Sequence, residues 1–195
     1  MKFNEIAKIN EQIENYKFEN EIIKILYEEA KLIENCEFVK CDLSYNELEK
    51  INISNCYFRS CNFSNCNFSK IGIHNCKIID SKMTGCNFSS CTLNNVNISE
   101  SRLDYTRFVE TKIIKSEFKE SNLNCGEFID TKINFVNFDN NNLGDITFIK
   151  TSLSGIDLKD NDIKRLNIEL KYLKGCTISH EAGCIFLESN GINIK

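Results

Sequence analysis

Proline is absent from this chain of 195 residues, although about ten would be average for that length. Each proline would remove a donor from a β ladder, so its absence favours a backbone that is hydrogen bonded throughout. No apolar run approaches the roughly 18 residues that cross a bilayer. The start, MKFNEIAKINEQIEN, lacks the apolar core of a signal peptide. We therefore expect a cytoplasmic protein without a membrane span.

An excess of positive charge is also missing. The 24 Lys and Arg residues are outnumbered by 28 Asp and Glu residues, which gives a net charge of −4. This balance argues against a nucleic-acid binder that works through bulk positive charge. The 11 cysteines are unusual for a chain without a secretory signal, because disulfide frameworks belong to oxidising compartments.

A five-residue period organises the chain. Every fifth residue from Phe38 to Ile178, 29 residues in all, is Phe, Leu, Ile or Met. Five matches neither the 3.6-residue period of a helix nor the two-residue period of a strand. Each pentapeptide must therefore be a short extended segment followed by a corner, and the coiled backbone is an all-β solenoid.

A second interior position lies two residues before each central residue. Cys, Ser, Thr, Gly or Val occupies it in 20 of 29 cases. Nine cysteines stand there, and we interpret them as small buried hydrophobic residues. Metal ligation and disulfides are the alternatives, since Cys36, Cys56 and Cys76 are expected to stack at a Cα spacing that permits a disulfide. Multiples of five are not a zinc-ligand spacing.

The units CNFSN (61–65), CNFSK (66–70), CNFSS (86–90) and SNLNC (121–125) resemble the repeats of the pentapeptide-repeat protein family. The resemblance covers residues 36–180. It implies a right-handed quadrilateral β-helix with one pentapeptide on each side. At roughly 4.8 Å between coils, the repeats would form about seven coils in a rod about 34 Å long. Lys171 is hard to bury, so the last coil is expected to open near 165–175.

The two ends depart from the repeat. Residues 1–35 are expected to form an N-terminal cap containing a helix at 20–34, because their apolar residues recur at helical spacing. Membrane binding by this helix is the rival interpretation, although its polar face is acidic. Residues 181–195 are expected to form a short helix, with Ser179 as N-cap and Gly191 past its end. A strand containing Ile192 and Ile194 would follow.

The ending LKGCTISHEAGCIFLESNGINIK resembles the C-terminal segment of the Qnr-type quinolone-resistance branch of the family. In that branch a helix and final strand form a two-fold dimer interface, so the resemblance implies a homodimer. A monomer capped by the helix is the alternative. The expected interface residues are Ile185, Phe186, Leu187, Ile192 and Ile194.

Catalytic constellations are sparse. His74 and His180 are the only histidines and lie far apart along the solenoid, which excludes a paired-histidine metal site or a nucleophile–histidine pair. No glycine-rich phosphate loop occurs, and a rod filled with Phe and Leu leaves no cavity for a substrate. We expect no enzymatic activity, no cofactor and no metal.

Charge is unequally divided among the four expected sides. The side that includes Phe38 carries eight acids and five bases, whereas the side before it carries Lys112, Lys115, Lys132, Lys171, Lys174 and no acid. An acidic ladder is expected at Glu100, Glu117, Glu120, Asp139, Asp157 and Asp160.

The Qnr resemblance implies that such a ladder mimics duplex DNA. It implies binding to a type II topoisomerase, DNA gyrase or topoisomerase IV, and modulation of the enzyme's inhibition by quinolones or toxins, without direct contact to nucleic acid. The alternative is an adaptor rod that binds another protein and has no effect on topoisomerase, its surface charge serving solubility.

Overall fold

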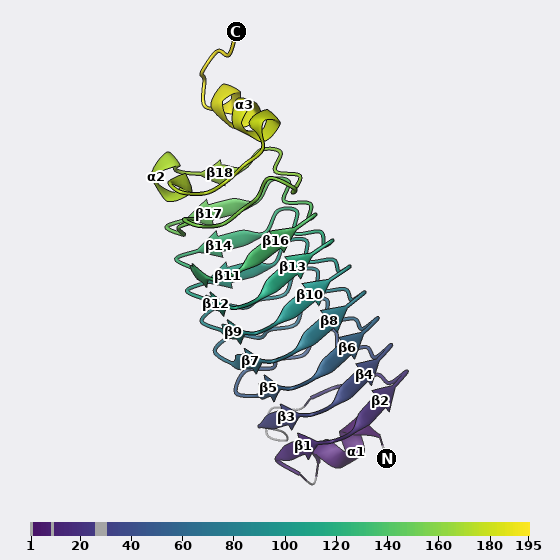
Figure 1. Cartoon of the computed structure of the whole chain (residues 1–195). Coiled ribbons are helices and arrows are strands. Elements are labelled where there is room, and N and C mark those ends of the chain that lie inside the picture. Colours follow the sequence, from purple (N-terminus) through teal and green to yellow (C-terminus); the bar gives the residue numbers. More distant parts are fainter. Residues whose placement is uncertain (1, 9, 26–30) are drawn as a thin grey trace.

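The computed structural model describes residues 2–8, 10–25 and 31–195, which form one elongated stack of coils (Figure 1). The N-terminus lies at one end of the stack and the C-terminus at the other. Each coil takes 20 residues, so residues 20 apart in sequence are neighbours in space. The expected β-solenoid is confirmed, but it has about eight coils and not the predicted seven, because the coils begin before residue 36.

One side of the rod is a parallel sheet of three-residue strands. Its strands pair in register at steps of 20 residues, as in Ile33 beside Ile53 and Ile113 beside Ile133. The strands, in spatial order, are β1 (Gln12–Glu14), β3 (Leu32–Glu34), β5 (Asn52–Ser54), β7 (Gly72–His74), β9 (Thr92–Asn94), β12 (Lys112–Ile114) and β15 (Lys132–Asn134).

The adjacent side is a second parallel sheet built in the same way. Phe38 pairs with Phe58, and Phe118 pairs with Phe138. Its strands are β2 (Lys17–Glu19), β4 (Glu37–Val39), β6 (Tyr57–Arg59), β8 (Lys77–Ile79), β10 (Asn97–Ser99), β13 (Glu117–Lys119) and β16 (Asn137–Asp139).

The remaining two sides are less regular. One contains only isolated parallel bridges, such as Asn62 to Lys82. The other begins with bridges and becomes a sheet in the C-terminal half, formed by β11 (Arg107–Val109), β14 (Glu127–Ile129), β17 (Thr147–Ile149) and β18 (Asn167–Ile168).

The central residues of the pentapeptides form the core. All 29 expected positions are buried except Ile133 and Ile178, which are partly buried and pack against the core. The phenylalanines stack in columns: the rings of Phe68 and Phe88 lie 4.8 Å apart and are inclined by 3°, and those of Phe108 and Phe128 are 4.5 Å apart. The five-residue period therefore correctly predicts the core.

The second interior position is buried as well. Its hydroxyl groups donate to backbone carbonyls, as in Thr111 Oγ1 to Phe88 O at 2.6 Å, which satisfies a buried polar group. Eight of the nine cysteines expected there are buried, and Cys176 is partly exposed. All eleven cysteines are free thiols.

The corners have a backbone conformation that the sequence analysis did not foresee. The residue two places after each central residue usually has a positive φ, for example 53° at Asn75 and 51° at Glu100. Between residues 35 and 165, Val, Ile and Thr never occupy this position. β-Branched side chains are the least tolerant of positive φ, so the corner geometry explains their absence.

The N-terminal prediction is wrong in part. No helix forms at 20–34 among the described residues: Ile22 makes a parallel bridge to Asp42, and residues 32–34 form β3. Residues 26–30 of the predicted helix lie outside the described part. The solenoid thus begins before residue 36, within the predicted cap. The capping helix is α1 (Phe3–Ala7), whose Phe3 is fully buried and packs edge-on against Phe18.

At the C-terminus the predicted opening of the last coil is wrong in part. The short helix α2 (Leu170–Leu173) interrupts the coil and Lys171 is exposed. The coil nevertheless pairs with the one before it, since the Leu153 N–H donates to the Tyr172 carbonyl at 2.9 Å and the Leu158 N–H donates to the Thr177 carbonyl at 2.7 Å. Helix α3 (His180–Ser189) follows, and Ser179 caps it by accepting a hydrogen bond from the Ala182 N–H at 3.1 Å. The predicted strand at Ile192 and Ile194 is not formed in the chain as described.

Candidate protein-binding surfaces

The six carboxylates of the expected acidic ladder lie along one side of the rod, the side of the β2 to β16 sheet. Glu117 belongs to β13 and Asp139 to β16. Glu100 and Glu120 stand at corners with positive φ, which turns both side chains outward. Asp157 and Asp160 follow beyond the last strand and are exposed. We call these six residues and the strands between them the acidic face.

Lysine side chains are interleaved with these acids. Lys119 Nζ lies 3.3 Å from Asp139 Oδ2 and 3.7 Å from Glu120 Oε1. The hydrogen bond with Asp139, followed by attraction to both carboxylates, raises the pKa of Lys119. This lysine therefore offsets one of the two charges beside it.

Lys159 has the same position two coils nearer the C-terminus. Its Nζ lies 3.0 Å from Asp157 Oδ2 and 4.0 Å from Asp160 Oδ2. The pKa of Asp157 is lowered first by the hydrogen bond from the Lys159 backbone N–H and then by the lysine ammonium. Within the described residues, Glu100 and Glu117 have no ion pair, and Glu117 Oε1 accepts a hydrogen bond from Asn137 Nδ2 at 2.9 Å.

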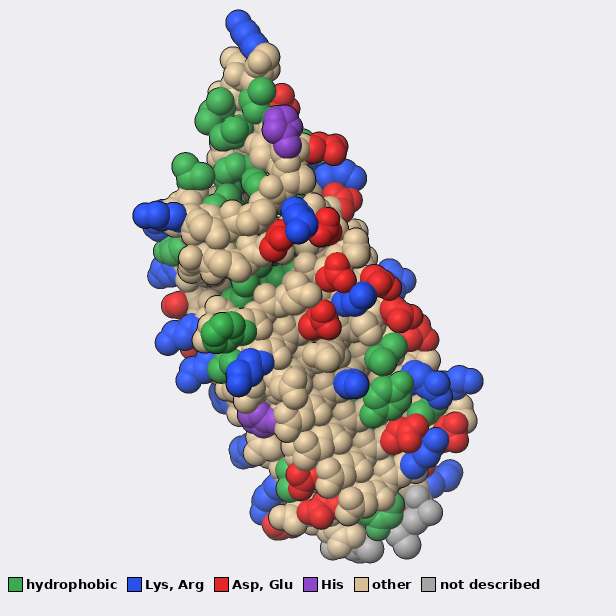
Figure 2. Space-filling view, viewed as in Figure 1, with side chains coloured by type: hydrophobic (Ala, Val, Ile, Leu, Met, Phe, Trp, Pro, Cys, Tyr) green, Lys and Arg blue, Asp and Glu red, His purple; other side chains and the backbone are tan. Residues whose placement is uncertain are grey.

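Figure 2 shows acidic side chains gathered along one edge of the middle and C-terminal parts of the rod. The N-terminal part of the same side is mixed, since Lys40, Arg59 and Lys77 lie there together with Glu37 and Asp80. The acidic character is therefore confined to about three coil steps.

The predicted basic side is shorter than the sequence suggests. Lys112 and Lys132 are paired neighbours in β12 and β15, and Lys115 lies at the following corner. Lys171 and Lys174 lie in and after α2, two coils beyond Lys132 and separated from it by a coil without a base on this side. Three lysines thus remain together on the β1 to β15 sheet.

The expected dimer residues lie at the C-terminal end, where Figure 2 shows a group of hydrophobic side chains. Leu187, Ile192 and Ile194 are exposed, whereas Phe186 is only 8% exposed and packs against the core. Ile185 is intermediate. A hollow of about 280 Å³ lies between α3 and the end of the rod, lined by Ile168, Leu170, Phe186, Leu187 and Ile192 among others.

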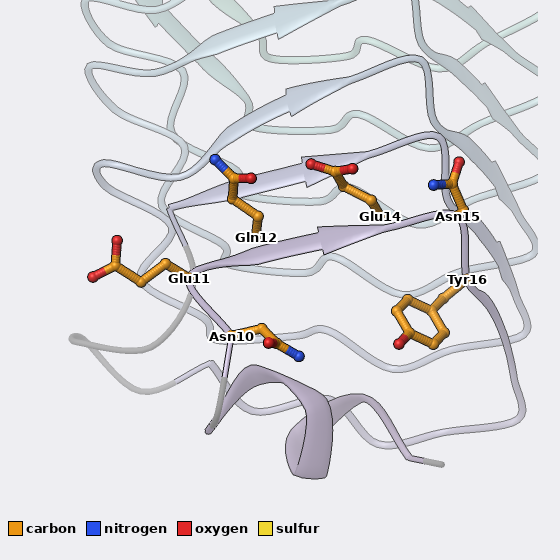
Figure 3. Close-up of a pocket in the computed structure, with 6 residues that line it drawn as sticks. All are labelled: Asn10, Glu11, Gln12, Glu14, Asn15 and Tyr16. Atoms are coloured by element: carbon orange, nitrogen blue, oxygen red, sulfur yellow. The ribbon is translucent and has the colours of Figure 1, made fainter.

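A second hollow, at the N-terminal end, has no catalytic arrangement among the described residues. Figure 3 shows this hollow of about 540 Å³, where the side chains point in different directions and Glu11 Oε1 is paired with Lys31 at 2.8 Å. The residues around it are Asn10, Glu11, Gln12, Glu14, Asn15 and Tyr16. Among the described residues, no three His, Cys, Asp or Glu side chains are grouped to hold a metal ion. None of the described helices is long and apolar enough to cross a membrane.

Comparison with known proteins agrees with this architecture. A family model described as a pentapeptide repeat region matches residues 51–127. Together with the five-residue period that the coils follow on both sides of this region, the match supports a pentapeptide-repeat protein. A search of curated proteins finds no match.

Several solved pentapeptide-repeat structures are similar over most of the chain. A trypsin-treated variant of QnrB1, a plasmid-mediated fluoroquinolone resistance protein, is 15% identical, covers 94% of this chain and 99% of its own, and has a TM-score of 0.47. HetL, involved in heterocyst differentiation regulation in the cyanobacterium Nostoc sp. strain PCC 7120, is 11% identical, covers 92% and 93%, and has a TM-score of 0.40. Values this low are no basis for assigning a partner.

Proposed function

We propose that this protein binds a type II topoisomerase, DNA gyrase or topoisomerase IV, by imitating duplex DNA with its acidic face. The observation that carries the proposal is the alignment of six carboxylates along one side of a rigid rod. The Qnr-like C-terminal sequence supplies the choice of partner. A row of fixed negative charges is complementary to a basic DNA-binding groove.

The charge density of the acidic face is lower than that of duplex DNA. The six acids span three coil steps, which is about 14 Å at the usual strand spacing. Duplex DNA carries about eight charges over that length. Lys119 and Lys159 reduce the net charge of the face to −4, from six acids and two bases. The face therefore has about half the charge density of DNA, and we expect an affinity that depends strongly on salt.

The ion pairs of Lys119 and Lys159 favour a second candidate. A rod whose acids are partly neutralised can serve as an adaptor that binds another protein through shape and mixed charge, without any effect on topoisomerase. The two candidates differ in whether duplex DNA competes with the partner.

A supercoiling assay tests the first candidate. Purified gyrase is titrated with this protein, with and without a fluoroquinolone, and supercoiled and cleaved DNA are quantified. We expect a dose-dependent change in supercoiling or in drug-stabilised cleavage. An unchanged gel pattern at a large molar excess of the protein would favour the adaptor.

We also propose that two copies associate through the C-terminal segment. Leu187, Ile192 and Ile194 form an exposed apolar group beside the hollow at the rod end, and apolar groups of this kind commonly mark interfaces. A two-fold dimer would join two rods end to end into one of about 75 Å at the usual coil spacing, and it would present two acidic faces of about 14 Å each.

Removal of residues 184–195 tests the dimer. We expect the intact protein to be a dimer at micromolar concentration and the truncated protein to be a monomer, as measured by light scattering. Because Phe186 is buried, Leu187→Ser combined with Ile192→Ser is the gentler variant and keeps this anchor of α3 in place. A monomeric intact protein, or dimers in both variants, would contradict the proposal.

A further inference from the structure

Eight buried cysteines are concentrated in the N-terminal half of the rod, and seven of them stack in columns, each member one coil above the last. Cys91 has no cysteine above or below it, because Ile71 and Thr111 occupy the neighbouring coils. The columns are Cys36, Cys56 and Cys76; Cys41 and Cys61; and Cys66 and Cys86.

Backbone geometry holds the columns at a distance suited to cross-linking. The Asn62 N–H donates to the Cys41 carbonyl at 2.9 Å, and the Tyr57 N–H donates to the Cys36 carbonyl at the same distance. Paired strands of this kind lie about 4.8 Å apart. Disulfides join residues whose Cα atoms are about 4.4–6.8 Å apart. Neighbouring cysteines of one column therefore satisfy the Cα requirement without backbone movement.

In two columns, neighbouring thiols shift each other's pKa while each thiol also donates to a backbone carbonyl, as in Cys56 Sγ to Ser54 O at 3.1 Å and Cys61 Sγ to Arg59 O at 3.4 Å. The thiol of Cys61 beside Cys41 lowers the pKa of Cys41 to about 7. Interaction with Cys56 likewise raises the pKa of Cys36 and lowers the pKa of Cys76, so the Cys56 thiol is next to both.

The thiols of the third column make the shortest of these bonds to carbonyls. Cys66 Sγ donates to the Leu43 carbonyl at 2.9 Å, and Cys86 Sγ donates to the Phe63 carbonyl at 3.0 Å. Burial is the main cause that raises the pKa of Cys66, to about 12. No hydrogen bond between these two thiols contributes to either pKa shift, unlike in the other two columns.

We propose that Cys41 and Cys61, and Cys56 with either Cys36 or Cys76, are sites of reversible disulfide formation between coils, in exchange with a small-molecule disulfide. The Cys41 thiolate attacks one sulfur of the small disulfide and displaces the other as a thiolate. The Cys61 thiolate then attacks the Cys41 sulfur and displaces the second small thiol. Two protein thiols lose two protons and two electrons, and one small disulfide is reduced to two thiols.

Because these cysteines are buried, the exchange requires local opening of the coil. Cys41 and Cys61 are 1% and 2% exposed, so a reagent reaches them only when the coil opens locally. Each cross-link closes a loop of 20 residues in the chain, and such closure stabilises a fold mainly by restricting the unfolded chain. Oxidation would therefore bind neighbouring coils together and suppress the opening that allowed it.

Peptide mapping of the oxidised full-length protein tests the proposal. The folded protein is incubated with oxidised glutathione, alkylated while denatured, and digested with trypsin. We expect the peptide 41–50 linked to 60–70, and 51–59 linked to 32–40 or 71–77. Cys91 is the internal control and is expected to be alkylated as a free thiol. Mixing with isotope-labelled protein distinguishes links within one chain from links between chains.

A variant supplies the matched control. In Cys61→Ala, Cys41 has no thiol with which to complete the exchange, so it is expected to accumulate as a mixed disulfide with glutathione. Oxidised wild-type protein is also expected to melt at a higher temperature than the reduced protein, with the difference lost on reduction. Finding only free thiols, only links between chains, or Cys91 oxidised as fully as Cys41 would overturn the proposal.

Discussion

Phe108→Ala is expected to lower the free energy of unfolding by about 3–5 kcal/mol, as is usual for truncation of a buried phenylalanine. Phe108 is fully buried. Its ring stacks between Phe88 at 5.0 Å and Phe128 at 4.5 Å, and meets Phe118 edge-on at 6.1 Å. The column cannot close the gap, because the backbone ladder fixes the distance between coils.

Chemical denaturation of this variant measures the loss. Lys112→Ala is a suitable control, since the Lys112 side chain is exposed on β12 and lies outside the core. We expect this variant to change the free energy of unfolding by no more than about 0.5 kcal/mol. Equal midpoints for wild type and Phe108→Ala would show that the five-residue register does not define the core.

Reversal of charge on the acidic face is expected to weaken topoisomerase binding on the order of 100-fold or more, a loss of about 2.7 kcal/mol. Glu100 and Glu117 are the most informative positions, because no ion pair within the described residues holds them. The full variant adds Glu120 and Asp139, with each of the four residues changed to Lys.

The opposite side of the rod provides a control with the same change in net charge. It carries six acids, and reversing four of them should leave binding nearly unchanged if the acidic face is the contact surface. These residues are Glu47, Glu110, Glu127 and Asp130. Circular dichroism of both variants verifies that the coils remain folded. Equal losses from the two sets would show that net charge alone controls binding.

Salt dependence follows from the same exposed charges. Contacts between exposed charges are screened once the Debye length falls below about 8 Å, which occurs above about 0.15 M salt. We expect the affinity of the wild-type protein to fall steeply there and that of the charge-reversed variant to vary little.

The sequence predicts the core well because the core depends on a strict period. Every coil repeats the same small set of backbone positions, so one register predicts the buried phenylalanines from Phe38 to Phe148. The corner geometry could also have been predicted, from the absence of Val, Ile and Thr at every fifth position between 35 and 165.

The helix predicted at 20–34 fails for a physical reason. Ile22 and Ile23 fit a helical spacing, but in the solenoid only Ile23 is buried and Ile22 is 71% exposed. The Ile23 N–H donates to the Asp42 carbonyl at 2.8 Å in the next coil. Pairing between coils overrides the local helical preference.

The sequence predicts that the acids of the acidic face lie in a row, but it does not predict how far neighbouring lysines neutralise them. Assigning pentapeptides to four sides places Glu117 and Asp139 on the same side, as the structure shows. Whether Lys119 contacts Asp139 in the next coil depends on side-chain conformation, which the repeat pattern does not determine. The partial neutralisation of the face therefore emerges only from the structure.

Competition with DNA tests the central claim most directly. Binding of the fluorescently labelled protein to gyrase is measured by anisotropy while unlabelled duplex DNA is added. The DNA-mimic account predicts that the duplex displaces the protein, because gyrase cannot bind both ligands at the same time. Absence of binding, or a ternary complex in which gyrase holds both the protein and the duplex at full affinity, would contradict it.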